Sequence, residues 1–200
     1  MRTSIRTTLL TGAAIWFITA SGLSAQTAEE PKAQPAPNYR FDFAVTYGAT
    51  ASDVVGGSSF WMQGGSLQAH GEIYRGLGAV ADFSGLHQGN IHSSGVGLDM
   101  ITAAFGPRYT WLPAQARYSF YGQALVGVAH GFDSDFPASS GVVAGSTSLT
   151  FRLGGGLNIA LTPRIGLRAI EATWLRTQFP NSSTGIQGSC QLNTGFVLRF

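Results

Sequence analysis

Histidines are the side chains of this sequence best suited to acid–base chemistry, and there are four of them: His70, His87, His92 and His130. A hydrolytic site needs such a base beside a hydroxyl nucleophile, with a carboxylate to orient the base. His92 precedes two serines within a Gly/Ser-rich segment, and His70 precedes Glu72 with only a glycine between them. No histidine forms a His-x-Ser pattern within a predicted strand. We therefore expect no catalytic residue and no enzymatic activity, with a lipid A-modifying enzyme as the alternative.

The remaining reactive side chains give equally little support for a metal or cofactor. Asp133 and Asp135 are spaced like the start of a calcium loop, but the later glycine and glutamate of that loop are missing. Cys190 is the single cysteine, so it cannot form an internal disulfide. No basic stripe of the kind that binds nucleic acid is present. We expect no metal, no cofactor and no nucleic-acid partner.

A group of charged residues shares one property, which is that each falls on the less apolar face of an alternating segment. The group comprises Arg40, Asp42, Glu72, Asp82, Arg108, Arg152 and Glu171, with Arg168 as a further candidate. Side chains of opposite charge on one face predict an internal salt-bridge network, because an unpaired buried charge costs several kcal/mol. The alternative is that the same groups form a path for ions or protons.

The strand that defines this alternation is the last nine residues, 192–200. Phe196, Leu198 and Phe200 fall on one face, and the intervening Val197 and Arg199 fall on the other. A soluble edge strand with so apolar a face would be prone to aggregation. A strand of a transmembrane barrel requires this pattern, because one face contacts lipid and the other faces the lumen. The aromatic residue 200 on such a strand resembles the terminal signature of bacterial outer-membrane proteins, and this resemblance implies that all three apolar residues form a C-terminal assembly signature.

Seven further segments alternate in the same way: residues 39–48, 60–73, 77–86, 100–111, 117–130, 148–161 and 165–177. Short turns alternate with longer loops, which include residues 87–99, 131–145 and 179–187, with 131–145 the longest irregular segment. Pro107 lacks a backbone donor and predicts a bulge or local break. The alternation slips near Arg168–Ala169, which predicts a β-bulge. The sequence therefore predicts an all-β fold, an eight-stranded antiparallel transmembrane up-and-down β-barrel.

Composition agrees with a membrane barrel. Charged residues make up only 11% of the chain, against about 25% in an ordinary soluble domain. After the N-terminus no apolar segment reaches the roughly 20 residues that a spanning helix needs. Amphipathic rings near predicted strand ends suit the two membrane interfaces, and they are Trp61, Tyr109, Trp111, Tyr118, Phe120 and Trp174.

Three regions follow one another along the chain. Residues 1–25 are typical of a signal peptide, with Arg2 and Arg6 before an apolar core and Leu23-Ser24-Ala25 before the cleavage position. Residues 26–37 are a Pro/Ala-rich flexible lead-in, and residues 38–200 carry the barrel pattern. Cleavage would leave ten basic and ten acidic residues, so the basicity belongs to the signal. We expect the mature chain in the outer membrane.

The segments FYGQALVGVAHG and LTFRLGGGLNIALTPRI, together with the terminal phenylalanine, resemble the eight-stranded family typified by the outer-membrane protein A barrel domain. The resemblance covers residues 38–200 and implies partnership with outer-membrane lipids and with the barrel assembly machinery. We expect no peptidoglycan-binding domain after the barrel. Eight strands leave an interior that side chains can fill, so we expect a monomeric structural protein whose external loops contact a surface ligand. A small channel is the remaining alternative.

Overall fold

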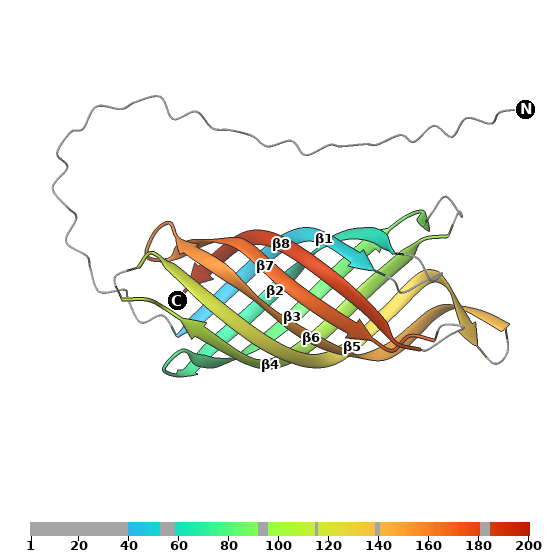
Figure 1. Ribbon diagram of the computed structural model, residues 1–200, viewed down its shortest axis with the longest axis horizontal. Coiled ribbons are helices and arrows are strands. Elements are labelled where there is room, and N and C mark those ends of the chain that lie inside the picture. The colour runs from blue at the N-terminus through green and yellow to red at the C-terminus, as the bar shows by residue number, and fades with distance from the viewer. Residues whose placement is uncertain (1–39, 53–58, 92–95, 115, 139–140, 181–184) are drawn as a thin grey trace, which may run out of the picture. The chain divides into compact units, whose positions relative to one another are not determined.

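The computed structural model describes residues 40–52, 59–91, 96–114, 116–138, 141–180 and 185–200. Eight strands form one closed antiparallel barrel in sequence order, which confirms the predicted fold class (Figure 1). Their bounds are β1 Phe41–Ser52, β2 Phe60–Tyr74, β3 Leu77–Gln88, β4 Leu98–Trp111, β5 Tyr118–Ala138, β6 Gly141–Ala160, β7 Ile165–Thr177 and β8 Gln187–Arg199. The short connections after β2, β4 and β6 lie at one end, here named the turn end. Strands β1, β3, β5 and β7 end at the other end of the barrel, here named the loop end.

Strict alternation of burial shows why these residues form a barrel. Along β1, Ala44 and Thr46 are buried whereas Phe43 and Val45 are exposed. Because side chains of a strand point to opposite faces, one face lines the lumen and the other forms the outer wall. Among the described residues, no helix is long and apolar enough to cross a membrane.

Closure depends on the pairing of the first strand with the last. β1 and β8 pair antiparallel from Asp42 opposite Arg199 to Ser52 opposite Ser189. Phe200 extends this seam: its amide donates to the Phe41 carbonyl at 2.8 Å, and its carbonyl accepts from the Phe41 amide at 3.3 Å. The terminal residue therefore adds hydrogen bonds as well as an apolar side chain to the join.

The predicted bulge in β7 is confirmed. Ala169 has no partner in the register with β6, which shifts between Leu157 and Asn158, and the pairing with β8 shifts between Arg168 and Glu171. The bulge turns both of these charged residues toward the lumen although they are three positions apart, which regular alternation would forbid.

Pro107 causes a local break without a bulge. Pairing between β4 and β5 runs to Phe105 opposite Val126 and resumes at Arg108 opposite Gln123 in the same register. The strand retains its pairing with β3 across this position, with Ala79 opposite Pro107. The missing donor therefore interrupts one ladder and leaves the other intact.

The prediction that residues 131–145 form an irregular loop is wrong. β5 continues to Ala138 and β6 begins at Gly141, so these residues form a hairpin that extends past the neighbouring strands at the loop end (Figure 1). β4 pairs with β5 only as far as Phe132, and β7 pairs with β6 only from Thr150. The Gly, Ser and Asp residues of this segment show no local alternation. The pairing of β5 with β6 depends on the facing strand instead, so the sequence did not predict it.

Candidate functional site: the filled lumen and the apolar outer wall

A single glutamine joins the charged side chains of the lumen. Gln68 of β2 is buried, and its Oε1 accepts hydrogen bonds from Arg108 Nη2 and from Arg168 Nη1, the latter at 2.5 Å. Its Nε2 donates to Asp82 Oδ2 at 2.9 Å and to Glu171 at 3.1 and 3.2 Å. The carboxamide thus presents its acceptor to two cations and its donor to two carboxylates, which holds both kinds of charge in one network.

Tyr121 of β5 lies between two of these guanidinium groups. The Arg108 guanidinium carbon lies 4.5 Å from the ring centroid, and that of Arg168 lies 4.7 Å from it. The hydroxyl donates to Glu171 Oε2, which also accepts from Arg168 Nη1 at 2.8 Å. Two cation–π contacts in a desolvated interior keep both arginines close together despite their like charges.

A second ion pair lies farther toward the loop end. Arg152 of β6 donates from Nη1 to Asp82 and to Ser84 Oγ at 3.2 Å, and from Nη2 to Gln191 Oε1 at 3.1 Å. Both members of the pair are buried. Since Asp82 also accepts from Gln68, this pair is continuous with the network around Tyr121.

The turn end of the lumen holds the third carboxylate. The Asp42 carboxylate of β1 accepts a hydrogen bond from His70 Nδ1 at 2.6 Å and lies 3.8 Å from Arg108 Nη1. The three buried arginines of the described lumen therefore face three carboxylates, those of Asp42, Asp82 and Glu171. This balance meets the requirement that charges in a low-dielectric interior be paired.

Two members of the predicted network lie elsewhere. Arg40 precedes β1 and is exposed; its carbonyl accepts from the Glu72 amide at 2.7 Å. Glu72 is also exposed, and its Oε1 accepts from the Gly76 amide at 2.9 Å within the β2–β3 turn. Both have the parity of lumen residues but lie at the rim, where the barrel wall ends. Alternation predicts which face of the sheet a side chain is on, but it does not predict how deep in the lumen that side chain lies.

Sequence reasoning omitted two central members of the network, Gln68 and Tyr121. Both are inward by parity, but neither carries a charge, so a search for balanced charges passes over them. Their inward position opposite charged strands was the available signal. Arg168, named only as a further candidate, is buried among these groups.

Apolar side chains pack inside the barrel on the loop-end side of the charged network. They form one buried cluster at the loop end: Phe60, Met62, Leu86, Ile91, Leu98, Met100, Ala129, Phe136, Leu175 and Phe179. The rings of Phe136 and Phe179 lie 5.4 Å apart. Gln187 holds the backbone of Phe179, because its Oε1 accepts from the Phe179 amide and its Nε2 donates to the Phe179 carbonyl, each at 2.9 Å. No sequence pattern predicted this buried apolar cluster.

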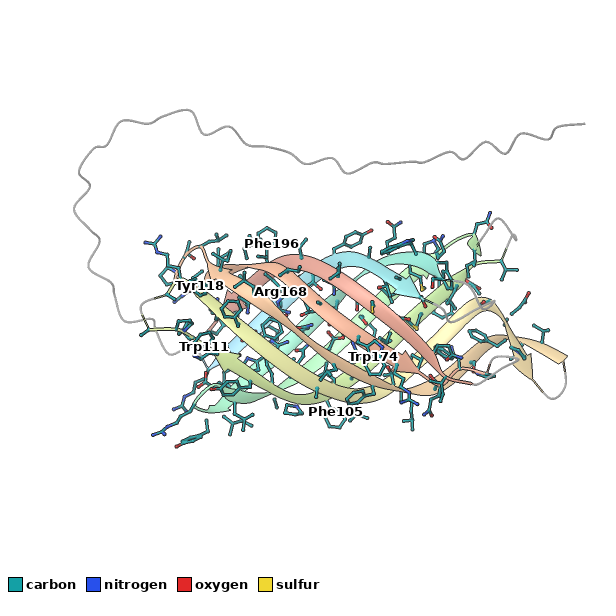
Figure 2. All side chains as sticks on the ribbon, in the orientation of Figure 1. Phe105, Trp111, Tyr118, Arg168, Trp174 and Phe196 are labelled. Carbon is teal, nitrogen blue, oxygen red and sulfur yellow. The ribbon has the colours of Figure 1, made fainter. Side chains whose placement is uncertain are left out.

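The outer wall carries the apolar and aromatic side chains that alternation assigned to it. Trp111 and Tyr118 lie toward the turn end and Trp174 toward the loop end, whereas Phe105 and Phe196 lie between (Figure 2). Trp111 stacks on Phe120 at 5.8 Å between ring centroids. All six predicted interface aromatics are exposed, as are the three C-terminal residues: Trp61, Tyr109, Trp111, Tyr118, Phe120, Trp174, Phe196, Leu198 and Phe200.

Each of the three described histidines pairs with either a carboxylate or a hydroxyl, and none of them pairs with both. His70 is buried against Asp42, His87 pairs with Asp99 on the outer wall, and His130 Nδ1 lies 2.7 Å from Thr147 Oγ1. His92 lies outside the described residues. Across the described chain, no group of three or more His, Cys, Asp or Glu side chains could hold a metal ion.

The two aspartates that are spaced like the start of a calcium loop, and the cysteine, also lie apart from the lumen network. Asp133 and Asp135 are exposed on the β5–β6 hairpin, and Asp133 adopts a positive φ of 54°. Cys190 is a free, exposed thiol on the outer wall. The chemistry that the lumen supports is therefore charge neutralisation and hydrogen bonding among its own side chains.

The closed barrel of eight antiparallel strands defines the fold class of small outer-membrane β-barrels. The chain is similar in structure to Neisserial surface protein A, with a TM-score of 0.58 at 17% identity over 80% of this chain and 97% of that one. Weaker similarity extends to Ail, the attachment invasion locus protein of Yersinia pestis (TM-score 0.49, 17% identity, 78% of this chain and 98% of that one). It also extends to the N-terminal β-barrel domain of Pseudomonas aeruginosa OprF (TM-score 0.45, 12% identity, 80% and 97%). No protein-family model and no curated protein matches the sequence.

Proposed function

We propose that this chain is an integral outer-membrane barrel with a closed lumen, and that it acts through its surface rather than through catalysis or conduction. The membrane location is supported by the outer wall, where every strand exposes large apolar side chains. Examples from β1 to β8 in order are Phe43, Leu67, Phe83, Phe105, Val126, Leu153, Ile170 and Phe196. Soluble monomers rarely expose contiguous apolar patches larger than about 300–600 Å², whereas lipid requires such a surface.

The packing of side chains inside the barrel supports the functional part of the proposal. A network of paired charges occupies the interior, and apolar rings lie over it at the loop end. Moving an ion through the barrel would require breaking buried ion pairs, at a cost of several kcal/mol for each uncompensated charge. A role as a structural membrane protein needs no such step.

The β5–β6 hairpin is the proposed contact surface. It extends beyond the pairing of β4 and β7, and Val142 on it is 67% exposed. Apolar side chains that protrude at the loop end, above the lipid-facing wall, are available to a partner at the cell surface. The loop after β3 is the second candidate surface, and its residues 92–95 lie outside the described residues.

Three measurements test the proposal. Membrane-extracted protein should migrate differently on a gel before and after boiling, and a soluble periplasmic protein without this shift would refute the membrane location.

Planar bilayers containing the purified barrel should show no conductance above leak; steady channels that change with Arg152→Ala would favour the channel alternative. Replacing residues 134–144 by a two-residue turn should leave the gel shift intact and abolish adhesion of expressing cells to a cultured cell layer, and unchanged adhesion would refute the contact role.

A further inference from the structure

A groove of about 420 Å³ opens on the outer wall near the loop end. It lies over β2, β3 and β4, and β1 and β5 contribute to its two sides. Its lining includes Tyr47, Gln63, Gly85, His87, Asp99 and Ile101. Gly85 is the reason for the hollow: it has the outward parity of its neighbours on β3, and a Cβ built on it would meet no atom within 4 Å. A strand that otherwise exposes Phe83, at 53%, therefore has a gap in its apolar wall.

Polar side chains meet in pairs along the loop-end side of this groove. Tyr47 Oη donates to Gln63 Oε1 at 3.2 Å across β1 and β2. His87 Nδ1 pairs with Asp99 Oδ1 across β3 and β4, with the side chains 63% and 23% exposed. An ion pair that faces hydrocarbon is costly, whereas the same pair at the interface is not. These two polar pairs therefore lie at the depth of lipid headgroups. The groove lies beside them, toward the hydrocarbon region.

We propose that this groove is a binding site for a phosphate-bearing membrane lipid, with one acyl chain over Gly85 and the phosphate at Gln63 and His87. The inference rests on the proposed membrane location and adds a specific lipid site to it. It does not depend on the contact role of the hairpin.

The donors of the site determine the chemistry of the headgroup. Asp99 occupies Nδ1 of His87, so Nε2 is the ring nitrogen left for a bound headgroup. The Gln63 carbonyl oxygen accepts from Tyr47, which leaves the amide N–H groups to donate. The Gln63 N–H groups, with the His87 ring beside them, favour an acceptor-rich headgroup such as a phosphate diester. The acyl chain is selected by Ile101 and Phe132, which continue the apolar wall.

The test measures binding of dioleoylphosphatidylglycerol to the purified full-length barrel in detergent micelles by native mass spectrometry. One lipid should bind saturably, and Gly85→Leu should raise the Kd at least about tenfold because the new side chain fills the groove. Gly122→Leu is the matched control: Gly122 is also exposed on the wall, and a Cβ there also meets no atom within 4 Å. Its Kd should not change.

The headgroup part is tested with His87→Phe, which keeps a planar ring but removes both ring nitrogens, and with His130→Phe as its control on the same wall. The first should weaken phosphatidylglycerol binding about tenfold and leave monoolein, which has no phosphate, unaffected. Equal Kd values for Gly85→Leu and the unmodified chain, an equal loss in Gly122→Leu, or equally tight binding of monoolein would overturn the proposal. Competition by millimolar inorganic phosphate would identify free phosphate as the ligand and would also overturn it. Boiling-dependent gel mobility of each variant separates these results from failure of the barrel itself.

Discussion

Replacing Glu171 by leucine should unfold the barrel at markedly lower denaturant. The carboxylate is fully buried and accepts hydrogen bonds from Arg168, Tyr121, Gln68 and Asn193. Leucine fills much of the space but leaves Arg168 without its ion-pair partner. Removing one member of a buried pair costs about 3–5 kcal/mol, because the remaining charge stays desolvated. We expect Glu171→Leu to lower the free energy of unfolding by that amount.

The double variant Arg168→Met/Glu171→Leu separates the contribution of the ion pair to the free energy of unfolding from the contribution of packing. It removes both charges, so the lumen keeps two arginines and two carboxylates. The combined loss should be smaller than the sum of the two single losses by about 1–3 kcal/mol, which is the usual interaction energy of residues in one network. Glu72→Leu is the matched control, because Glu72 is exposed at the β2–β3 turn and its loss should stay near about 1 kcal/mol.

The assay is guanidinium chloride unfolding of the refolded barrel in phosphatidylcholine vesicles, followed by tryptophan fluorescence and extrapolated linearly to water. Boiling-dependent gel mobility at each concentration reports closure of the barrel independently. The reasoning is refuted if Glu171→Leu and Glu72→Leu change the free energy of unfolding equally. It is also refuted if the double variant loses the full sum of the single losses.

Four further outcomes follow from the geometry. Deleting Ala169 should abolish the gel shift, because without the bulge residue Arg168 or Glu171 would face lipid; a normal shift would show that the bulge is dispensable. Phe179→Ala should cost about 3–5 kcal/mol in the same unfolding titration, and unchanged stability would contradict an apolar closure of the lumen. In vesicles, Cys190 should react with an apolar maleimide but not with a charged one, and equal labelling would place it outside the lipid-facing wall. Removing Phe200 should reduce the fraction of chain that assembles into barrels, since two seam hydrogen bonds are lost; pulse-labelled cells with undiminished assembly would contradict this.

Period-2 alternation was enough to predict the fold. The side chains of one strand alternate between two faces whatever the strand pairs with, so the outward set on β1 and β8 could be read locally. The slip at Arg168–Ala169 was readable for the same reason, because one extra residue reverses the alternation that follows it. Eight such segments with alternating short and long connections left a closed barrel as the simplest arrangement.

The candidate site was predicted only in part. Inward parity identified Asp82, Arg108, Arg152 and Glu171 as lumen residues. It failed for Glu72, which has the same parity but lies beyond the end of the wall. Depth in the lumen depends on where the neighbouring strands end, and no local pattern carries that information.

The sequence by itself determined which face each side chain takes, because the strand period is a property of one chain segment. Tertiary structure alone decided which residues meet: the register of eight strands brings Gln68 between Arg108 and Arg168, and the ladder between β5 and β6 converts an apparent loop into a hairpin. These contacts join residues up to 100 positions apart. They are set by barrel closure and by the pairing of buried charges in a low-dielectric lumen, and both of these act only after the strands have come together.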